Sequence, residues 1–188
     1  DGFGNLEGFE DFDEDVTVAI LEEANKLCRD VLLPINWPGD QEGCRIENGV
    51  VRTPKGFQEA YKQFCEGGWA GLGVSQEWGG QGAPHSLGKM VEEMTCSANL
   101  SFGLYPGLTG GAMVALEAYG SDELKNFYMP KMASGEWSGT MCLTEPHCGT
   151  DLGMLRTKAE PQDDGSYLVT GNKIFISAGD HDLTDNIV

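Results

Sequence analysis

The stretch MCLTEPHCGTDLG, residues 141–153, gathers two carboxylates, one imidazole, two thiols and two hydroxyls within thirteen positions. These groups could bind a metal. Zinc sites usually take their ligands from two separated pairs, whereas this is one cluster that mixes hard and soft donors. We therefore expect no metal here, although the candidate ligands by residue type are Glu145, His147, Cys148, Asp151 and, further along the chain, His181.

Other reactive arrangements fit the sequence less well. Cys142 and Cys148 are too far apart for the C-x-x-C motif of redox thiols, and no G-x-S-x-G motif supplies a hydrolase serine. The chain has no G-x-x-x-x-G-K-[ST] motif, and after Gly71 and Gly73 a dinucleotide-binding loop would have glycine where Gln76 stands. The familiar phosphate-binding loops are therefore excluded.

A remaining interpretation rests on the backbone of the same stretch. A strand over residues 139–144 would run into a turn with Pro146 and Gly149, while Thr144 and Thr150 would offer hydroxyls. Glycine removes the Cβ that keeps a ligand away from the chain, and successive backbone N–H groups bind anions without a cation. Such a loop suits a nucleotide cofactor. An ordinary surface turn has the same composition, so both interpretations stay open at this level.

The elements that precede this stretch are helical. Apolar residues recur every three or four positions over residues 13–33, which predicts an amphipathic helix that Pro34 ends. Asn48-Gly49 predicts a turn between two short β-type segments, and the glycine-rich residues 67–84 predict a loop. Helical spacing predicts further helices over residues 55–66, 86–99, 107–119 and 121–133.

Beyond residue 134 the apolar period changes to two, which is typical of strands. The fold class is therefore α+β, with an all-helical N-terminal domain over residues 1–136 and the first strands of a β domain over residues 137–188. The short β-type segments are residues 137–144, 155–162, 166–172 and 173–179, with a hairpin turn at residues 163–165.

The composition restricts the partners of the chain. The 30 acidic and 12 basic side chains give a formal charge of -18, which repels a phosphate backbone and argues against nucleic acid. No apolar segment approaches the roughly 20 residues of a membrane-spanning helix. The six cysteines lie mostly in apolar runs, as reduced and packed thiols do, so we expect a cytoplasmic protein. The chain starts at Asp1 and ends on a β-type pair, which indicates a fragment.

The sequence LTEPHCGTD, residues 143–151, closely resembles the signature of the acyl-CoA dehydrogenases, which reads Thr-Glu-Pro, two variable residues, then Gly, Ser or Thr, and Asp. Three further stretches resemble family motifs in the same order along the chain: SQEWGGQG (75–82), MPKMASGEW (129–137) and GNKIFISAG (171–179). The departures from the family pattern, which keep the size class or the hydroxyl, are Met141, His147, Phe175 and Ser177.

The resemblance implies a truncated acyl-CoA dehydrogenase fold: the helical N-terminal domain and the start of a β-barrel-like middle domain, with the C-terminal helical bundle absent. The implied cofactor is FAD. Thr144 would offer its hydroxyl to the flavin ring, and Thr150 would also contact the substrate. No catalytic residue is expected in this chain, because the family's base is a glutamate of the C-terminal bundle and Glu145 belongs to the signature turn. The implied FAD-binding residues are Met141, Leu143, Thr144, Gly149, Thr150, Phe175 and Ser177.

The implied reaction is α,β-dehydrogenation of an acyl-CoA thioester to the trans-2-enoyl-CoA, with an electron-transfer flavoprotein as acceptor and a homodimer or homotetramer as the complete assembly. The segments ANLSFGLYPGLTGGA and ISAGDHDLTDNIV resemble the large bacterial subgroup of methylmercaptopropionyl-CoA dehydrogenases. The fragment alone is expected to be inactive. Two alternatives remain: an acyl-CoA oxidase or flavin monooxygenase of the same fold, and a non-enzymatic, acidic helical module that binds a partner protein.

Overall fold

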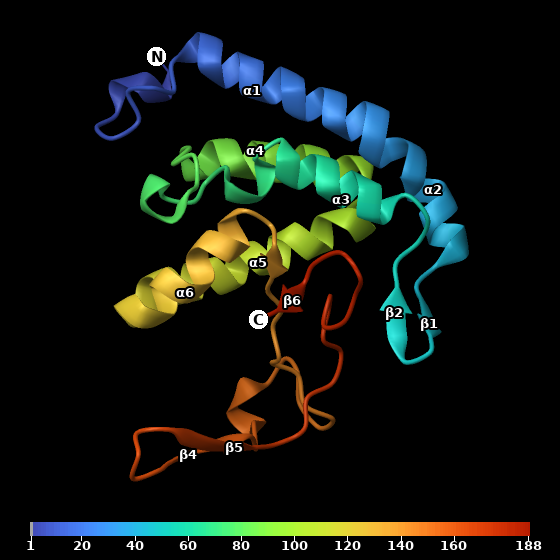
Figure 1. Cartoon of the computed structure of the whole chain (residues 1–188), viewed down its shortest axis with the longest axis vertical. Helices are drawn as coiled ribbons and strands as arrows, with labels where there is room; N and C mark the ends of the chain where they lie inside the picture. Colours follow the sequence, from blue (N-terminus) through green and yellow to red (C-terminus); the bar gives the residue numbers. More distant parts are fainter. Residues whose placement is uncertain (1) are drawn as a thin grey trace.

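The computed structural model describes residues 2–188 and places a body of helices beside a smaller region of short strands (Figure 1). This order agrees with the α+β class that the sequence predicts. Within these residues, no helix is both long and apolar enough to cross a bilayer. The helices are α1 (Glu14–Leu27), α2 (Leu33–Glu42), α3 (Phe57–Glu66), α4 (His85–Ala98), α5 (Leu100–Tyr119) and α6 (Asp122–Ala133). The strands are β1 (Arg45–Glu47), β2 (Val50–Arg52), β3 (Trp137–Ser138), β4 (Lys158–Pro161), β5 (Tyr167–Thr170) and β6 (Asn186–Ile187).

A single helical path runs through α1 and α2, so the prediction that Pro34 ends the first helix was wrong. Residues Cys28–Leu32 form one π-helical turn, after which the N–H of Leu33 bonds to the carbonyl of Cys28. Pro34 follows in the first turn of α2, where a residue without an N–H is tolerated. The path ends at Gly43, whose φ of 66° is one that glycine adopts without strain.

The core of the helical body is an aromatic cluster between α3 and α5. Phe57, Tyr61 and Phe64 recur at four- and three-residue steps on α3, so they share one face, and all three are buried. They pack around Phe102 of α5, whose ring centroid lies 5.7 Å from that of Phe64. A second apolar cluster joins α1 to α4 and to the residues before α1. These two clusters join α1, α3, α4 and α5.

The other predicted helices are present as α4, α5 and α6, and α5 begins earlier than expected. The spacing predicts a helix from Gly107, after Pro106, whereas α5 starts at Leu100. Asn99 caps this start by accepting a hydrogen bond from the N–H of Phe102, which is buried in the core. Capping and burial of the first turn therefore outweigh the proline, which lies inside α5.

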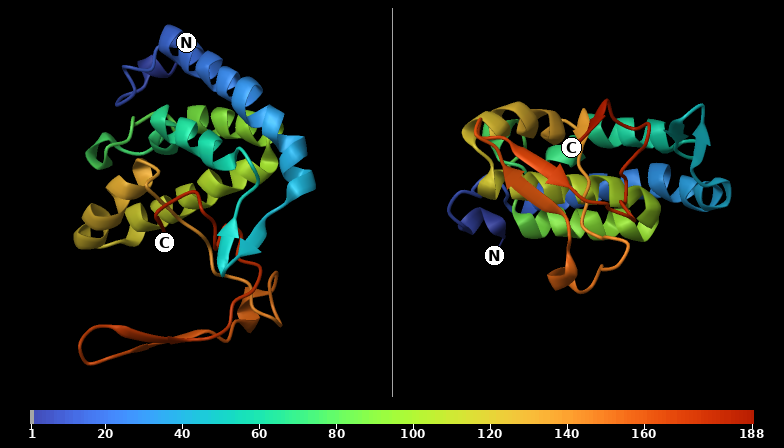
Figure 2. Two further views of the ribbon diagram at one scale, coloured as in Figure 1. Left: turned by 45° about the vertical axis from the view of Figure 1, so that its right-hand side comes forward. Right: turned by 90° about the horizontal axis from the view of Figure 1, so that it is seen from below.

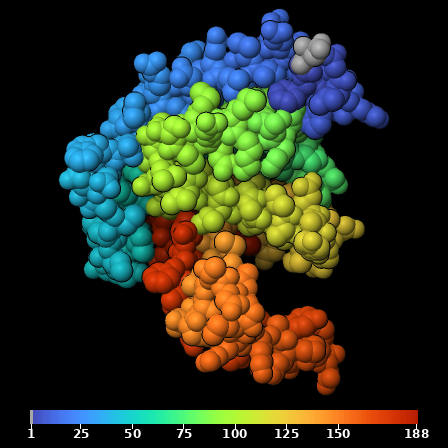
Figure 3. Space-filling model, turned by 180° about the vertical axis from the view of Figure 1, so that it is seen from behind, coloured from blue at the N-terminus to red at the C-terminus, as the bar shows by residue number. Residues whose placement is uncertain are grey.

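The strands form two-stranded pairs within residues 2–188. β1 and β2 make the hairpin predicted at Asn48-Gly49, where both residues have positive φ, as the tight hairpin turn requires. β4 pairs antiparallel with β5 around the predicted turn at residues 163–165, and β3 pairs parallel with β6. The β4–β5 hairpin extends away from the helices in Figures 1 and 2, and Figure 3 shows these orange residues as a projection.

Two predicted strands are irregular segments, so that prediction was wrong. Residues 139–144 and 173–179 are joined by a single backbone hydrogen bond, from the N–H of Ile174 to the carbonyl of Thr144 (2.9 Å). A strand requires a ladder of such bonds with a neighbour. Among residues 2–188, the bond from the N–H of Thr140 to the carbonyl of Val188 continues the β3–β6 pair by one residue, and no ladder extends further along these segments. Positive φ at Phe175 (55°) interrupts the extended path as well.

Candidate functional site

The signature stretch lies against the segment that carries Phe175 and Ser177. The hydroxyl of Thr140 donates to the carbonyl of Ser177 at 2.6 Å, and the N–H of Ile174 donates to the carbonyl of Thr144 at 2.9 Å. The fold thereby brings together two segments that are far apart in the sequence and that both resemble family motifs.

The turn after Thr144 is closed by its own backbone. The N–H of Glu145 donates to the carbonyl of Cys148 at 2.8 Å, and the N–H of Cys148 donates back to the carbonyl of Glu145 at 3.1 Å. The turn folds Gly149 onto Thr144, because a Cβ built on Gly149 would lie 3.4 Å from Thr144 Cγ2 and 3.8 Å from its Oγ1. These bonds use main-chain atoms and do not involve the half-buried Thr144 hydroxyl, which lies beside bare backbone.

Glu145 is the buried anion of this region, with 3% of its surface exposed. Its carboxylate accepts hydrogen bonds from the N–H groups of Arg156 (2.8 Å) and Thr157 (2.9 Å) and from the Lys173 ammonium (2.9 Å). Hydrogen bonds from Thr157, Lys173 and Arg156 hold the pKa of Glu145 well below its ordinary value. Such a carboxylate is a poor proton acceptor at neutral pH, so Glu145 holds the turn in place.

Three of the possible metal ligands are close together, since the ligand atoms of Glu145, His147 and Cys148 lie within 4.8 Å of one another. Their surroundings disfavour a cation. Lys173 places a positive charge 2.9 Å from the Glu145 carboxylate. His147 Nε2 lies 3.0 Å from the carbonyl of Met154, and this hydrogen bond requires a proton on that nitrogen. The group therefore resembles a hydrogen-bonded turn more than a metal site.

The remaining two candidate ligands do not join this group. Asp151 accepts a hydrogen bond from the N–H of Gly153 at 3.1 Å. His181 is buried beside Ser138, whose hydroxyl lies 3.0 Å from Nε2. The five side chains that the sequence offered as ligands therefore do not converge on one point.

The large apolar side chains of these two segments face solvent. Met141 exposes 58% of its surface and Phe175 exposes 85%. Leu143 is half-buried, and Thr150 and Ser177 are exposed. Exposed apolar groups that adjoin hydroxyls and backbone donors are typical of a binding surface. Two hydrogen bonds join the segments that carry these residues, and their role in binding stays a prediction.

Lys173 belongs to this region, and sequence reasoning did not single it out. Its ammonium donates to the carbonyl of Leu143 at 3.0 Å and to Glu145 at 2.9 Å. A lone lysine at the start of the apolar run Ile174–Ile176 was a possible signal, because a lysine seldom becomes buried without a partner. The sequence does not indicate which carboxylate that partner is.

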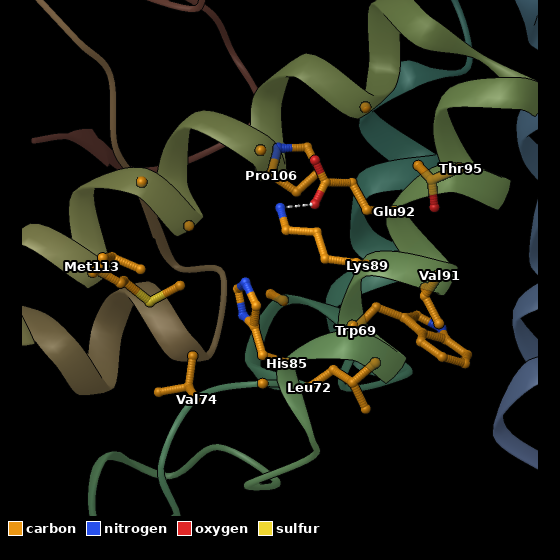
Figure 4. A pocket seen from close by; sticks show the side chains of 18 of the residues that line it. Trp69, Leu72, Val74, His85, Lys89, Val91, Glu92, Thr95, Pro106 and Met113 are labelled. Atoms are coloured by element: carbon orange, nitrogen blue, oxygen red, sulfur yellow. Dashed lines mark hydrogen bonds and ion pairs between the residues drawn. The ribbon is translucent and has the colours of Figure 1, made fainter. Parts of the chain in front are cut away.

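A groove of about 410 Å³ lies between α4 and α5 on the helical body, and the sequence analysis did not predict it (Figure 4). Its α4 side carries His85 and the ion pair of Lys89 with Glu92. Its α5 side is open at Gly107 and Gly111, where an added Cβ would meet no atom within 4 Å. Apolar walls with a few polar groups are typical of small-molecule sites.

Known proteins share both the helical body and the signature. A family model described as "Acyl-CoA dehydrogenase, N-terminal domain" matches residues 17–136. The chain belongs to the acyl-CoA dehydrogenase family. The match extends from within α1 to the residue before β3, so it covers most of the helical body. The family predicted from the signature is confirmed by a match that lies outside the signature itself.

Individual proteins are similar over almost the whole chain. The 3-methylmercaptopropionyl-CoA dehydrogenase of Ruegeria pomeroyi is 47% identical over 183 residues, which are 97% of this chain and 31% of that protein. The solved butyryl-CoA dehydrogenase of Megasphaera elsdenii has a TM-score of 0.74 at 22% identity, over 88% of this chain and 41% of that one. PigA with FAD and proline has a TM-score of 0.71 at 22% identity, over 87% of this chain and 40% of that one. These structures confirm the fold, and the chain spans less than half the length of each protein.

Proposed function

We propose that the chain is part of an FAD-dependent acyl-CoA dehydrogenase that converts an acyl-CoA thioester into the trans-2-enoyl-CoA. One observation carries the proposal: in a chain of this family, the Thr144 hydroxyl lies beside the bare backbone of Gly149 and next to the segment of Phe175 and Ser177. The relatives named as acyl-CoA dehydrogenases support the reaction class.

The donor set fits a flavin. Thr144 and Ser177 supply hydroxyls, Gly149 lets a ligand approach the backbone, and Met141 and Phe175 offer exposed apolar surface to a planar ring. PigA, which shares the fold, is described with FAD. Bound FAD would accept the hydride, and the protein would orient it and shield it from water. We assign FAD binding to Met141, Leu143, Thr144, Gly149, Thr150, Phe175 and Ser177, and substrate binding also to Thr150.

The base that removes the α-proton is assigned to a part of the protein outside this chain. Glu145 does not suit the role, because three donors already bind its carboxylate. We propose that residues 1–136 are the helical N-terminal domain and that residues 137–188 begin a β middle domain. A C-terminal helical bundle with the catalytic glutamate would complete the enzyme.

The first candidate substrate is 3-methylmercaptopropionyl-CoA, because the relative of that name is 47% identical. Butyryl-CoA is the second, from the solved relative. We further propose an electron-transfer flavoprotein as the acceptor, a homodimer or homotetramer as the assembly, and the cytoplasm as the compartment. The six cysteines, all free, fit a reducing compartment.

The test uses the full-length protein. It should purify yellow, and anaerobic addition of the substrate should bleach the flavin absorbance, with 3-methylmercaptopropionyl-CoA and butyryl-CoA compared in one panel. Rapid oxygen consumption during turnover would favour the oxidase or monooxygenase alternative. A colourless protein that takes up no added FAD would contradict the proposal and favour the interaction module.

A further inference from the structure

One ammonium group holds both neighbours of Thr144. Lys173 Nζ donates to the carbonyl of Leu143 at 3.0 Å and to Glu145 Oε1 at 2.9 Å. The carbonyl of Thr144 itself accepts from the N–H of Ile174 at 2.9 Å. Residues 143–145 of the signature are therefore hydrogen-bonded to Lys173 and Ile174, which belong to the segment that carries Phe175 and Ser177. This arrangement leaves the Thr144 backbone little freedom to rotate.

The ion pair at the centre of this arrangement is sheltered from water. The side chain of Glu145 is 2% exposed and that of Lys173 is 18% exposed. Solvent screens a sheltered pair less than a surface pair, and removal of one partner leaves the other charge buried and unpaired. The second carboxylate oxygen, Oε2, accepts the N–H of Arg156, so Glu145 is also anchored from a third segment.

We infer that Lys173 is a positioning residue for the flavin site: by holding the Leu143 carbonyl and the Glu145 carboxylate, it fixes the direction of the Thr144 hydroxyl. The inference rests on the proposed function. A hydrogen bond to a flavin atom is directional, and small displacements of a hydroxyl weaken it. Lys173 itself does not contact the reacting atoms in this arrangement. Its effect on the cofactor passes through Thr144.

The test is a double-mutant cycle in the full-length protein. The variants are Lys173→Met, Thr144→Val and the double variant, and Lys158→Met is the matched control because Lys158 is exposed on β4. The measurements are the dissociation constant of FAD, obtained by titrating the apoprotein, and the flavin absorbance spectrum. Lys173→Met should weaken FAD binding about tenfold, within the range of coupled neighbours. Lys158→Met should leave both readouts unchanged.

The double variant distinguishes action through Thr144 from a general structural role of Lys173. If Lys173 acts through Thr144, then Lys173→Met should cause little further loss of affinity and no further spectral change in the Thr144→Val background. A general structural role would give the same loss in both backgrounds and would overturn the inference. Far-UV circular dichroism of each apoprotein checks folding. If Lys173→Met does not fold, Lys173→Gln and Lys173→Arg replace it in the same cycle, and Lys173→Arg, which keeps the charge, should lose less affinity.

The two proposals fail in different ways. A wild-type protein that takes up no FAD overturns both the proposed function and this inference. A yellow wild type whose FAD affinity is insensitive to Lys173→Met overturns the positioning role and leaves the proposed function intact.

Discussion

The side chain of Asn99 joins two helices at once. Its Oδ1 accepts a hydrogen bond from the N–H of Phe102 at 3.0 Å, which caps α5, and its Nδ2 donates to the carbonyl of Leu32 at 3.2 Å. Leu32 closes the π turn between α1 and α2. Asn99 is 1% exposed, so both of these hydrogen bonds are buried. This residue therefore sets α5 against the α1–α2 path.

Replacement of Asn99 by alanine should destabilise the protein strongly. Asn99→Ala removes a helix cap, worth about 1 kcal/mol, and the buried hydrogen bond to the Leu32 carbonyl, worth about 0.5–1.5 kcal/mol more. Asn99→Asp keeps the cap but should lose at least as much stability, because its carboxylate would be buried against the Leu32 carbonyl oxygen. Urea unfolding monitored by circular dichroism measures the change. Asn126→Ala on α6, which removes an exposed hydrogen bond, is the control and should change the free energy of unfolding by less than about 0.5 kcal/mol.

His181 should make stability depend on pH. Its ring is 6% exposed, Nδ1 accepts the N–H of Leu183 at 3.2 Å, and burial lowers its pKa. The native state therefore prefers the neutral ring. The contribution of His181 to the free energy of unfolding is fully present above the pKa of the ring in the unfolded state, about 6.5. It is lost as the pH is lowered from there through the lower pKa of the folded state.

The measurement for His181 is the free energy of unfolding between pH 8 and about pH 5 in the wild type and in His181→Gln. The difference between the two proteins isolates this residue from the many carboxylates. His85→Gln, at an exposed position, is the control. A wild type whose stability falls no more steeply than that of His181→Gln would show that protonation of the ring is not penalised.

Gly149 should tolerate a methyl group and reject a charge. In Gly149→Ala the new Cβ would make ordinary contact with Thr144 Cγ2 at 3.4 Å, so the fold should be kept, while its partial cover of the backbone should weaken FAD binding by only about threefold. Gly149→Asp places a carboxylate beside the Thr144 hydroxyl and should weaken FAD binding by about tenfold or more. Titration of the full-length apoprotein compares the two variants. Equal losses in both would mean that the space at Gly149, and not charge, controls binding.

Glu145→Gln should lower stability without abolishing the reaction. The substitution leaves Lys173 without its anion and loses an acceptor for the Arg156 and Thr157 amides, so the melting temperature should fall. At saturating FAD, kcat of the full-length enzyme should stay within about tenfold of the wild type, whereas loss of a general base removes about 10²–10⁴-fold. A loss of that larger size, in a folded and yellow variant, would identify Glu145 as the base.

Two glycines of α5 should respond to alanine with opposite signs. Gly111 is exposed and an added Cβ meets no atom within 4 Å, so Gly111→Ala should stabilise the protein by about 0.5–1 kcal/mol through helix propensity. Gly103 is buried, and an added Cβ would lie 2.8 Å from Cys96 Sγ, so Gly103→Ala should cost about 1–3 kcal/mol. Thermal unfolding of both variants tests the packing of α4 against α5, and a destabilised Gly111→Ala would contradict it.

Local patterns in the sequence predicted the helices well, because each apolar face repeats within one element. Phe57, Tyr61 and Phe64 illustrate this, since their spacing alone places them on one buried face of α3. The start of α5 was missed because the burial of Phe102 depends on contacts with other helices, although the cap at Asn99 is a local hydrogen bond. Sequence periodicity carries no information about those contacts.

The candidate site was predicted only in part, and for a related reason. The signature and the family resemblance named Thr144 and Gly149, whose closeness follows from one short turn. The pairing of Glu145 with Lys173 joins distant segments, so only the fold reveals it. The expected strands at residues 139–144 and 173–179 failed because alternation describes the side chains, whereas a strand also requires a backbone partner.

The π turn at Cys28–Leu32 has a consequence for helical phase. It holds one residue more than an α-helical turn, so every position after it is rotated by about 100° relative to an uninterrupted α-helix. Leu33 and Trp37, which expose 52% and 70% of their surface, lie on the far side of this shift. The residues of α2 are therefore offset in helical phase from those of α1, and deletion of a single residue between the two helices would turn a different face of α2 toward the core.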